Sequence, residues 1–301
     1  MSYSERNLTN TQDQTIKKIS NENDVSIDEE NSINEEVPEE TKKKLNALIN
    51  KAPKLELTII ASLFLEENLK IKINCKGLED NSLRNIKDGK TYFGLVSPSN
   101  ENINKKIDFN TGNNDIINTK SDIHYGLQFR IKFDINNCCY FIKDCSFGNG
   151  YGTFMKVYKE MIIKDNTLIN IGENYIVFTF GVDEIEPEEN DTIDDEKQNI
   201  LSVKVFRGEL VNYSYVFNKS QVNKIIIGKG ENCNIVLNDE LLDDVHCVIQ
   251  FKEIGWFIKD GDENNNTTNG TWISLSDETK IFEGMLIQSN QNIYQCHLIE
   301  K

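Results

Sequence analysis

The chain has 301 residues, 38% of them hydrophobic, and a formal net charge of −16 at pH 7. That length is enough for two domains of ordinary size, and the low hydrophobic content predicts that part of the chain is disordered. No apolar run reaches the ~20 residues that a membrane span needs, and the N-terminal segment lacks the apolar core of a secretory signal. We therefore expect an intracellular protein, cytoplasmic or nuclear, with no membrane partner.

The negative charge is concentrated in two segments. Residues 1–41 hold eleven acidic against three basic residues, and residues 183–197 hold nine against one. The only basic cluster, residues 41–54, is short and is typical of a solvated amphipathic helix. Because a nucleic-acid-binding face needs a concentrated basic patch, we predict that the chain has no nucleic-acid partner.

The seven cysteines are scattered and include no Cys-x-x-Cys pair. This pattern predicts reduced, mostly buried thiols in a cytosolic or nuclear protein and argues against a zinc site. No other motif indicates a cofactor or a small-molecule substrate, so none is expected.

The N-terminal region, residues 1–53, is predicted to be a disordered acidic tail followed by one short helix. Residues 1–40 are polar and have no hydrophobic period. Residues 41–52 can form a helix with Leu45, Leu48 and Ile49 on one face.

Short segments of alternating hydrophobicity, rich in β-branched residues, fill residues 54–182. They include "KLELTIIASLF", "NLKIKINCKG", "IHYGLQFRIKFDI", "NCCYFIKD", "KEMIIKDN" and "YIVFTFG". Short strands punctuated by turn residues predict a β-sandwich or barrel. After the acidic residues 183–200, which predict a flexible linker, the same pattern restarts with "LSVKVFRG" and continues to "YQCHLIE". The fold class expected is all-β, with a second sandwich over residues 201–301.

The two halves share landmarks in the same order. The first half has "YFGL" (92–95), "SDIH" (121–124), "CYFIKDCS" (139–146) and "GNGYGT" (148–153); the second has "IIGK" (226–229), "DDVH" (243–246), "GWFIKDGD" (255–262) and "TTNGTW" (267–272). These pairs indicate a divergent internal repeat of about 100 residues or more.

The stretch "FGNGYGTFMKVYKEMIIK" (147–164) is similar to the glycine-rich loop of a protein kinase. Its glycines are spaced G-x-G-x-G, one residue short of G-x-G-x-x-G, and no H-R-D or D-F-G follows. A turn in which glycine supplies a positive φ explains the stretch better. With no G-x-S-x-G or P-loop either, we predict that the chain is not an enzyme.

The second half closely resembles the forkhead-associated (FHA) domain, and the first half resembles it more weakly. The family pattern is Gly-Arg after an apolar strand, Ser-x-x-His, an aromatic strand ending in Asp, and Asn-Gly-Thr. The resemblance implies two sandwiches whose end loops hold a phosphothreonine peptide. In the family, arginine, serine and asparagine contact the peptide while histidine braces the loop. A phosphate dianion needs several converging donors, which makes this assignment chemically reasonable.

Carried over residue by residue, the first half keeps only part of the pattern. Ser121, Asn149 and Gly150 match peptide-contact positions, whereas Leu95 stands where the family has arginine. The resemblance implies loop-bracing roles for Gly94 and His124.

In the second half, the candidate contacts are Lys229, in the arginine position, with Thr268 and Asn269. Asp243 occupies the serine position. The loop-bracing residues implied by the resemblance are Gly228, His246, Gly270 and Thr271. Trp256 and Trp272 are interpreted as sandwich core or rim.

Asp243 has two interpretations. It can be a loop acid that hydrogen-bonds a turn, as in an Asx-turn. It can also mimic the phosphate-bound state, or select a basic or unphosphorylated partner. A carboxylate ~4 Å from a unit negative charge costs about 4 kcal/mol at an effective dielectric near 20, and phosphate carries nearly two such charges.

Two functions remain open. The first is a scaffold or adaptor that recognises a protein partner, with threonine phosphorylation read through a partly degenerate site. The second is a structural component of a large cytoskeletal or ciliary assembly that binds independently of phosphate.

Overall fold

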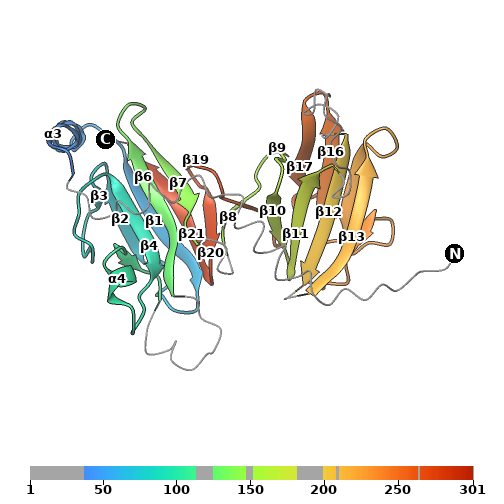
Figure 1. The fold of residues 1–301 in the computed structure, drawn as a ribbon, viewed down its shortest axis with the longest axis horizontal. Helices are drawn as coiled ribbons and strands as arrows, with labels where there is room; N and C mark the ends of the chain where they lie inside the picture. Colours follow the sequence, from blue (N-terminus) through green and yellow to red (C-terminus); the bar gives the residue numbers. More distant parts are fainter. Residues whose placement is uncertain are drawn as a thin grey trace, which may run out of the picture. The chain divides into compact units, whose positions relative to one another are not determined.

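The computed structural model describes residues 37–112, 125–146, 152–181, 199–207, 210–263 and 265–300, with the backbone alone for residues 210–212. The fold is all-β, as expected, and strands make up nearly all of its regular structure (Figure 1). In the part of the chain so described, no helix is long and apolar enough to cross a membrane.

The predicted N-terminal helix is present as α3 (Glu39–Leu48) and begins two residues earlier than expected. Glu39 and Glu40 lie in its first turn, where carboxylates interact favourably with the helix dipole. Leu45 is its buried residue, and Leu48 lies partly exposed on the same side. A second, one-turn helix, α4 (Glu101–Asn104), was not expected from the sequence.

The described chain forms two compact units. The first unit comprises Met1–Gly152, Glu278–Ile281 and His297–Lys301. The second comprises Thr153–Asp277 and Phe282–Cys296. Both units therefore draw residues from both halves of the sequence, and the limits 54–182 and 201–301 for two consecutive sandwiches stay a prediction.

The first unit contains a five-stranded sheet and a three-stranded meander. The sheet has the order β19 (Thr279–Lys280), β7 (Cys139–Asp144), β6 (Gly126–Asp134), β4 (Lys90–Leu95) and β5 (Phe109–Asn110). The meander is β1 (Lys54–Ser62), β2 (Lys70–Asn74) and β3 (Gly77–Leu78). Every second side chain of these strands points inward and helps to form the core. In the core, the rings of Phe93 and Phe129 stack with centroids 4.4 Å apart.

The second unit contains a matching five-stranded sheet and a larger one. The first has the order β15 (Ile235–Val236), β14 (Lys224–Gly228), β16 (Cys247–Lys252), β17 (Gly255–Asp260) and β9 (Met161–Ile162). The larger runs β13 (Leu210–Asn218), β12 (Ile200–Arg207), β11 (Asn174–Phe180), β10 (Thr167–Ile171), β18 (Trp272–Ser274), β8 (Thr153–Lys156), β20 (Leu286–Ser289) and β21 (Asn292–Ile299). Trp256 and Trp272, which were interpreted as core or rim, are both buried.

The two five-stranded sheets agree strand for strand. In each, a strand with a glycine at or next to its end, Gly94 in β4 and Gly228 in β14, pairs in parallel with a two-residue strand and antiparallel with the strand that follows, β6 or β16. The next strand carries the repeated Phe-Ile-Lys-Asp, and the last is a two-residue strand. Two of the shared landmarks, the glycine-containing strand and the Phe-Ile-Lys-Asp strand, therefore occupy equivalent positions in the two sheets.

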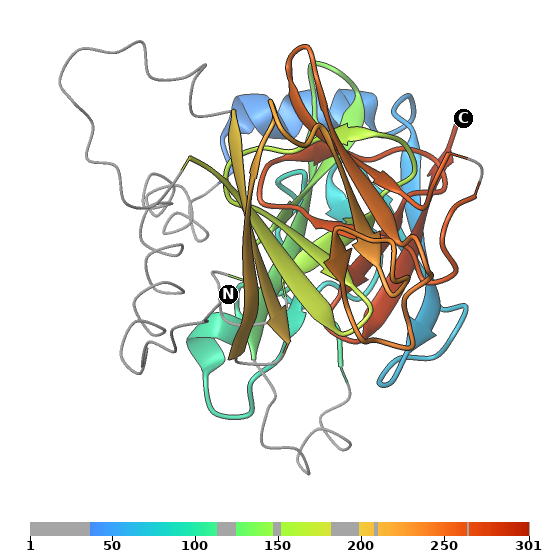
Figure 2. The same ribbon diagram turned by 90° about the vertical axis from the view of Figure 1, so that its right-hand side faces the viewer.

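The last strand of each five-stranded sheet comes from the other half of the sequence. In the second unit, β9 pairs with β17 through Phe257 and Ile258. In the first unit, β19 pairs with β7. The strand β11 also pairs with β12 over seven residues, and Figures 1 and 2 show the two side by side. Each unit thus holds strands that follow the Asn-Gly-Thr landmark of the opposite half, an arrangement that we call the strand exchange.

All seven cysteines are thiols that form no disulfide within the described residues. Cys75, Cys145, Cys247 and Cys296 are buried, whereas Cys138 is exposed. Burial raises the pKa of Cys247 and Cys296, so these thiols stay protonated and inert at neutral pH.

Candidate functional site

In the first half, most of the predicted contacts cannot be placed. Ser121, His124, Asn149 and Gly150 lie outside the described residues. Leu95, in the arginine position, is only 2% exposed and packs in the core of the first unit. It therefore offers no contact to a ligand.

Gly94 allows a close approach between two strands. A Cβ on Gly94 would lie 2.4 Å from the carbonyl oxygen of Gly126, too close for any side chain. The backbone of β4 can therefore approach β6 only with glycine at this position.

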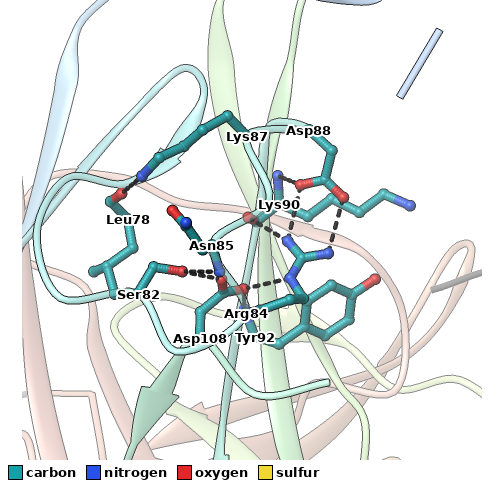
Figure 3. Close-up of polar contacts among 9 residues, drawn as sticks. All are labelled: Leu78, Ser82, Arg84, Asn85, Lys87, Asp88, Lys90, Tyr92 and Asp108. Carbon is teal, nitrogen blue, oxygen red and sulfur yellow. Dashed lines mark hydrogen bonds and ion pairs between the residues drawn. The ribbon is translucent and has the colours of Figure 1, made fainter. Parts of the chain in front are cut away.

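Arg84, before β4, does not replace the missing arginine (Figure 3). Its Nε donates to Asp108 at 3.0 Å, and its two terminal nitrogens donate to Asp88 at 3.0 and 2.9 Å. Its Nη2 also donates to the carbonyl oxygen of Lys90, and the guanidinium lies over the ring of Tyr92. These bonds use four of its five donors inside the first unit.

Burial lowers the pKa of Arg84, but hydrogen bonding to Asp88 and the charges of Asp108 and Asp88 outweigh it and raise the pKa above its usual value. Burial raises the pKa of Asp108. We interpret this cluster as a scaffold that holds the segment before β4, since its arginine is 2% exposed.

In the second unit, the end of β14 is joined to the turn that contains Asp243. A Cβ on Gly228 would lie 2.3 Å from the carbonyl oxygen of Asp244, so only glycine fits. The backbone N–H groups of Lys229 and Gly230 donate to the carbonyl oxygens of Asp243 and Asp244, each at 3.1 Å. This pairing leaves the Lys229 side chain exposed at the surface.

His246 connects two turns. It is fully buried; its Nδ1 accepts a hydrogen bond from the backbone N–H of Asp243 at 3.3 Å, and its Nε2 lies 3.2 Å from the carbonyl oxygen of Gly270. Burial lowers the pKa of His246, which favours the neutral ring. With Nδ1 as acceptor, Nε2 carries the proton and donates to Gly270.

The Asn269–Gly270 turn is fixed by side chains around it. The carboxylate of buried Asp260 accepts from both the backbone N–H and the hydroxyl of Thr267. The hydroxyl of Thr267 in turn accepts from the Gly270 N–H at 2.9 Å. Asn269 donates through Nδ2 to the carbonyl oxygen of Leu241 at 2.7 Å. Gly270 has a φ of +80°, a conformation that favours glycine.

Asp243 faces this turn. One of its carboxylate oxygens accepts a hydrogen bond from the backbone N–H of Thr268 at 2.9 Å. The acid in the serine position therefore occupies a donor of the very turn that the resemblance assigns to peptide contact. Asp244 beside it is exposed and adds a second negative charge.

The structure thus brings the four predicted contacts of the second half together. We call Lys229, Asp243, Thr268 and Asn269 the loop site. Two hydrogen bonds stabilise the loop site. The Thr268 backbone N–H donates to the Asp243 carboxylate, and the Asn269 side-chain amide donates to the Leu241 carbonyl oxygen. Over the described ranges, no group of three or more His, Cys, Asp or Glu residues could hold a metal ion.

Sequence reasoning missed Lys156, which ends β8 and pairs with Trp272. Its side chain lies against Gly270, with Cε and Nζ 2.5 and 3.0 Å from where a Cβ on Gly270 would be. No signal within the second-half motifs could have found it, because it comes from the first half of the sequence.

Comparison with solved structures gives matches of low identity. The structure described as "Rv0020c_FHA Structure" is 18% identical, with a TM-score of 0.18, over 33% of this chain and 91% of that one. The Slr1951 protein from Synechocystis sp. is 16% identical, with a TM-score of 0.17, over 30% and 88%. A structure from a "structural and functional analysis of phosphothreonine-dependent FHA domain interactions" is 16% identical, with a TM-score of 0.15, over 28% and 83%.

A search of curated proteins finds no match. The family comparison does find one, and it falls on the segment that builds the loop site. Residues 225–292, from β14 to the start of β21, match the FHA domain.

Proposed function

We propose that this chain is a non-enzymatic interaction adaptor whose loop site binds an extended peptide of a partner protein. The family match at residues 225–292 supports an interaction module, since FHA domains generally bind phosphothreonine peptides. The observation that carries the finer proposal is the 2.9 Å hydrogen bond from the Thr268 N–H to the Asp243 carboxylate. We infer from it that binding at this site does not require phosphate.

The electrostatics of Asp243 support this inference. A phosphate group near the Thr268 N–H would approach the carboxylate that already accepts from it. At ~4 Å and an effective dielectric near 20, each unit of like charge costs about 4 kcal/mol. The exposed ammonium of Lys229 returns less, because an exposed ion pair contributes about 1 kcal/mol or less. A neutral or singly charged peptide avoids most of this repulsion.

The hydrogen bond between Thr268 and Asp243 also favours a second candidate function. In it, the two halves are rigid parts of a larger cytoskeletal or ciliary assembly, and no short peptide is recognised. Both candidates place the protein inside the cell, in the cytoplasm or nucleus, in keeping with its free thiols. They differ in whether isolated peptides bind to the loop site.

The test compares the full chain with its Asp243→Ser variant against a degenerate phosphothreonine peptide library and the unphosphorylated twin library. The full chain is expected to bind the unphosphorylated library at least as tightly as the phosphorylated one. The variant loses the carboxylate and gains a hydroxyl donor, so it should prefer the phosphorylated library by about tenfold or more. If neither the full chain nor the variant binds any peptide, the assembly component is favoured. A strong preference of the unaltered chain for the phosphorylated library would contradict the proposal.

A further inference from the structure

Lys156 places a second ammonium group at the loop site. Its strand is antiparallel to β18, and the backbone N–H of the next residue, Val157, donates to the carbonyl oxygen of Thr271 at 2.8 Å. This pairing fixes the end of β8 beside the start of β18. The lysine side chain then crosses the Gly270 backbone, with its Nζ 3.0 Å from where a Cβ would be.

The Gly270 turn can accept this side chain only because it has none of its own. A Cβ there would lie 2.5 Å from the Cε of Lys156, well inside contact distance. The glycine therefore serves two purposes, a positive φ of +80° and the space that Lys156 fills. The ammonium is consequently held within a few ångströms of the Asn269–Gly270 backbone.

Among the described residues, no acidic side chain lies within ion-pair distance of the Lys156 ammonium. Within the described ranges, neither Lys156 nor Lys229 has an ion-pair partner, although twelve ion pairs involving other residues are resolved there. Asp243, by contrast, already has a backbone donor. The loop site therefore has two ammonium groups with unused donors, one at the end of β14 and one beside the Asn269–Gly270 turn.

We propose that Lys156 is a further binding residue of the loop site and that it selects partner peptides carrying an acidic side chain. The proposal rests on the proposed function, because it specifies the ligand of the same site. A singly charged carboxylate can meet an ammonium donor while keeping its distance from Asp243. A phosphate dianion roughly doubles both the attraction to the ammonium and the repulsion from Asp243, and the Thr268 N–H that it would need is already bonded to Asp243.

The strand exchange is what makes this residue available. Lys156 belongs to the first half of the sequence, whereas Lys229, Thr268 and Asn269 belong to the second. The site is therefore composed of both halves, and a fragment limited to residues 201–301 lacks one of its two cations.

The test must separate the charge of Lys156 from its packing on Gly270. Lys156→Met keeps an unbranched stem over the glycine and removes the ammonium. Lys156→Arg keeps the charge. Lys143→Met is the matched control, because Lys143 is also half-buried on a strand, has no ion-pair partner within the described ranges, and lies in the first unit.

The measurement is fluorescence anisotropy of the full chain and each variant with three labelled peptide pools of otherwise equal composition. One pool carries fixed Asp or Glu, one carries Asn or Gln at those positions, and one carries phosphothreonine. The acidic pool should bind the full chain more tightly than the amide pool. Lys156→Met should weaken the acidic pool about tenfold, equal to about 1.4 kcal/mol, and leave the amide pool unchanged. Lys156→Arg and Lys143→Met should bind like the unaltered chain.

Equal binding of the acidic pool by the Lys156→Met variant and the unaltered chain would overturn the proposal, provided that both melt at the same temperature. The proposal would also be overturned if Lys156→Met weakened the binding of the acidic and amide pools equally, because that result would show a packing role for Lys156. Tighter binding of the phosphothreonine pool than of the acidic pool would assign the anion to phosphate and overturn the acidic-peptide assignment. If no pool binds the unaltered chain, the proposed function fails and this inference fails with it.

Discussion

Cutting the chain between residues 182 and 199 should leave the two pieces bound to each other. The reason is the strand exchange, in which strands from residues 153–181 form part of the second unit. Six apolar side chains of that segment are at most 2% exposed: Val157, Ile163, Ile169, Ile171, Ile176 and Phe178. At about 2 kcal/mol for each buried side chain, they contribute roughly 12 kcal/mol. That equals the total stability of a typical domain, about 5–15 kcal/mol.

Polar contacts add to this association. The carboxylate of buried Asp239 accepts from the backbone N–H of Glu173 and from Nδ2 of Asn174, each at 2.8 Å. Arg207 forms an ion pair with Glu173 and donates to the carbonyl oxygen of Asn238 at 3.1 Å. The turn between β10 and β11 is therefore attached to the loop that precedes the loop site.

The assay places a protease recognition sequence within residues 183–197 and cuts the purified full chain. The two pieces should co-elute in size-exclusion chromatography in buffer and separate only when urea unfolds them. The uncut chain is the control for elution position. Separation of folded pieces in buffer would refute the reasoning. It would indicate that each half completes its own sandwich, with β19 joining the second half and the strands of residues 153–181 joining the first.

Three further outcomes are expected for the full chain. Asp239→Ala should lower the free energy of unfolding by about 3 kcal/mol, measured by urea titration, because its donors lose a charged acceptor. Arg84→Met should cost about 3–5 kcal/mol in the same titration, because it leaves buried carboxylates without their counter-charge. The third concerns His246, whose pKa is lowered by burial even though Asp260, Asp243 and Asp239 oppose the shift. The unfolded chain therefore binds this proton more readily. The stability from the neutral ring is present above pH about 6.5 and is lost as the pH falls below it. The melting temperature should drop between pH 7 and pH 5, and His246→Asn should drop less; equal drops would exclude His246 as the cause.

Much of the strand content could be predicted from the sequence because alternation with a period of two is a local property. The helix begins two residues and ends four residues earlier than expected. Its start was missed because its capping residue is Pro38 and not one of the polar residues that usually mark an N-terminus. The one-turn helix α4 is too short to show a period.

The strand exchange could not be predicted from the sequence. Both halves carry the same alternation and the same landmarks, so the pattern specifies which residues form strands but not which copy each strand joins. The choice depends on contacts between distant residues, such as Asp239 with Glu173 and Arg207 with Glu173. None of them has a local signature.

The candidate site could be predicted only in part, because sequence motifs relate residues within one half of the chain but not between the halves. Lys229, Asp243, Thr268 and Asn269 lie in one half, where motif spacing could relate them, and the structure brings them together. The sequence left two interpretations of Asp243 open and did not identify Thr268 as its hydrogen-bond donor. Lys156 was missed because it reaches the site across the strand exchange.

The most direct measurement for the central claim is the ratio of the dissociation constants of the full chain for the unphosphorylated and the phosphothreonine peptide pools. The unphosphorylated pool should bind at least as tightly as the phosphothreonine pool, since Asp243 occupies the Thr268 donor and repels a dianion. Binding confined to the phosphothreonine pool, with a ratio of about one hundred or more, would contradict it. That result would show that the loop site reads phosphate despite its aspartate.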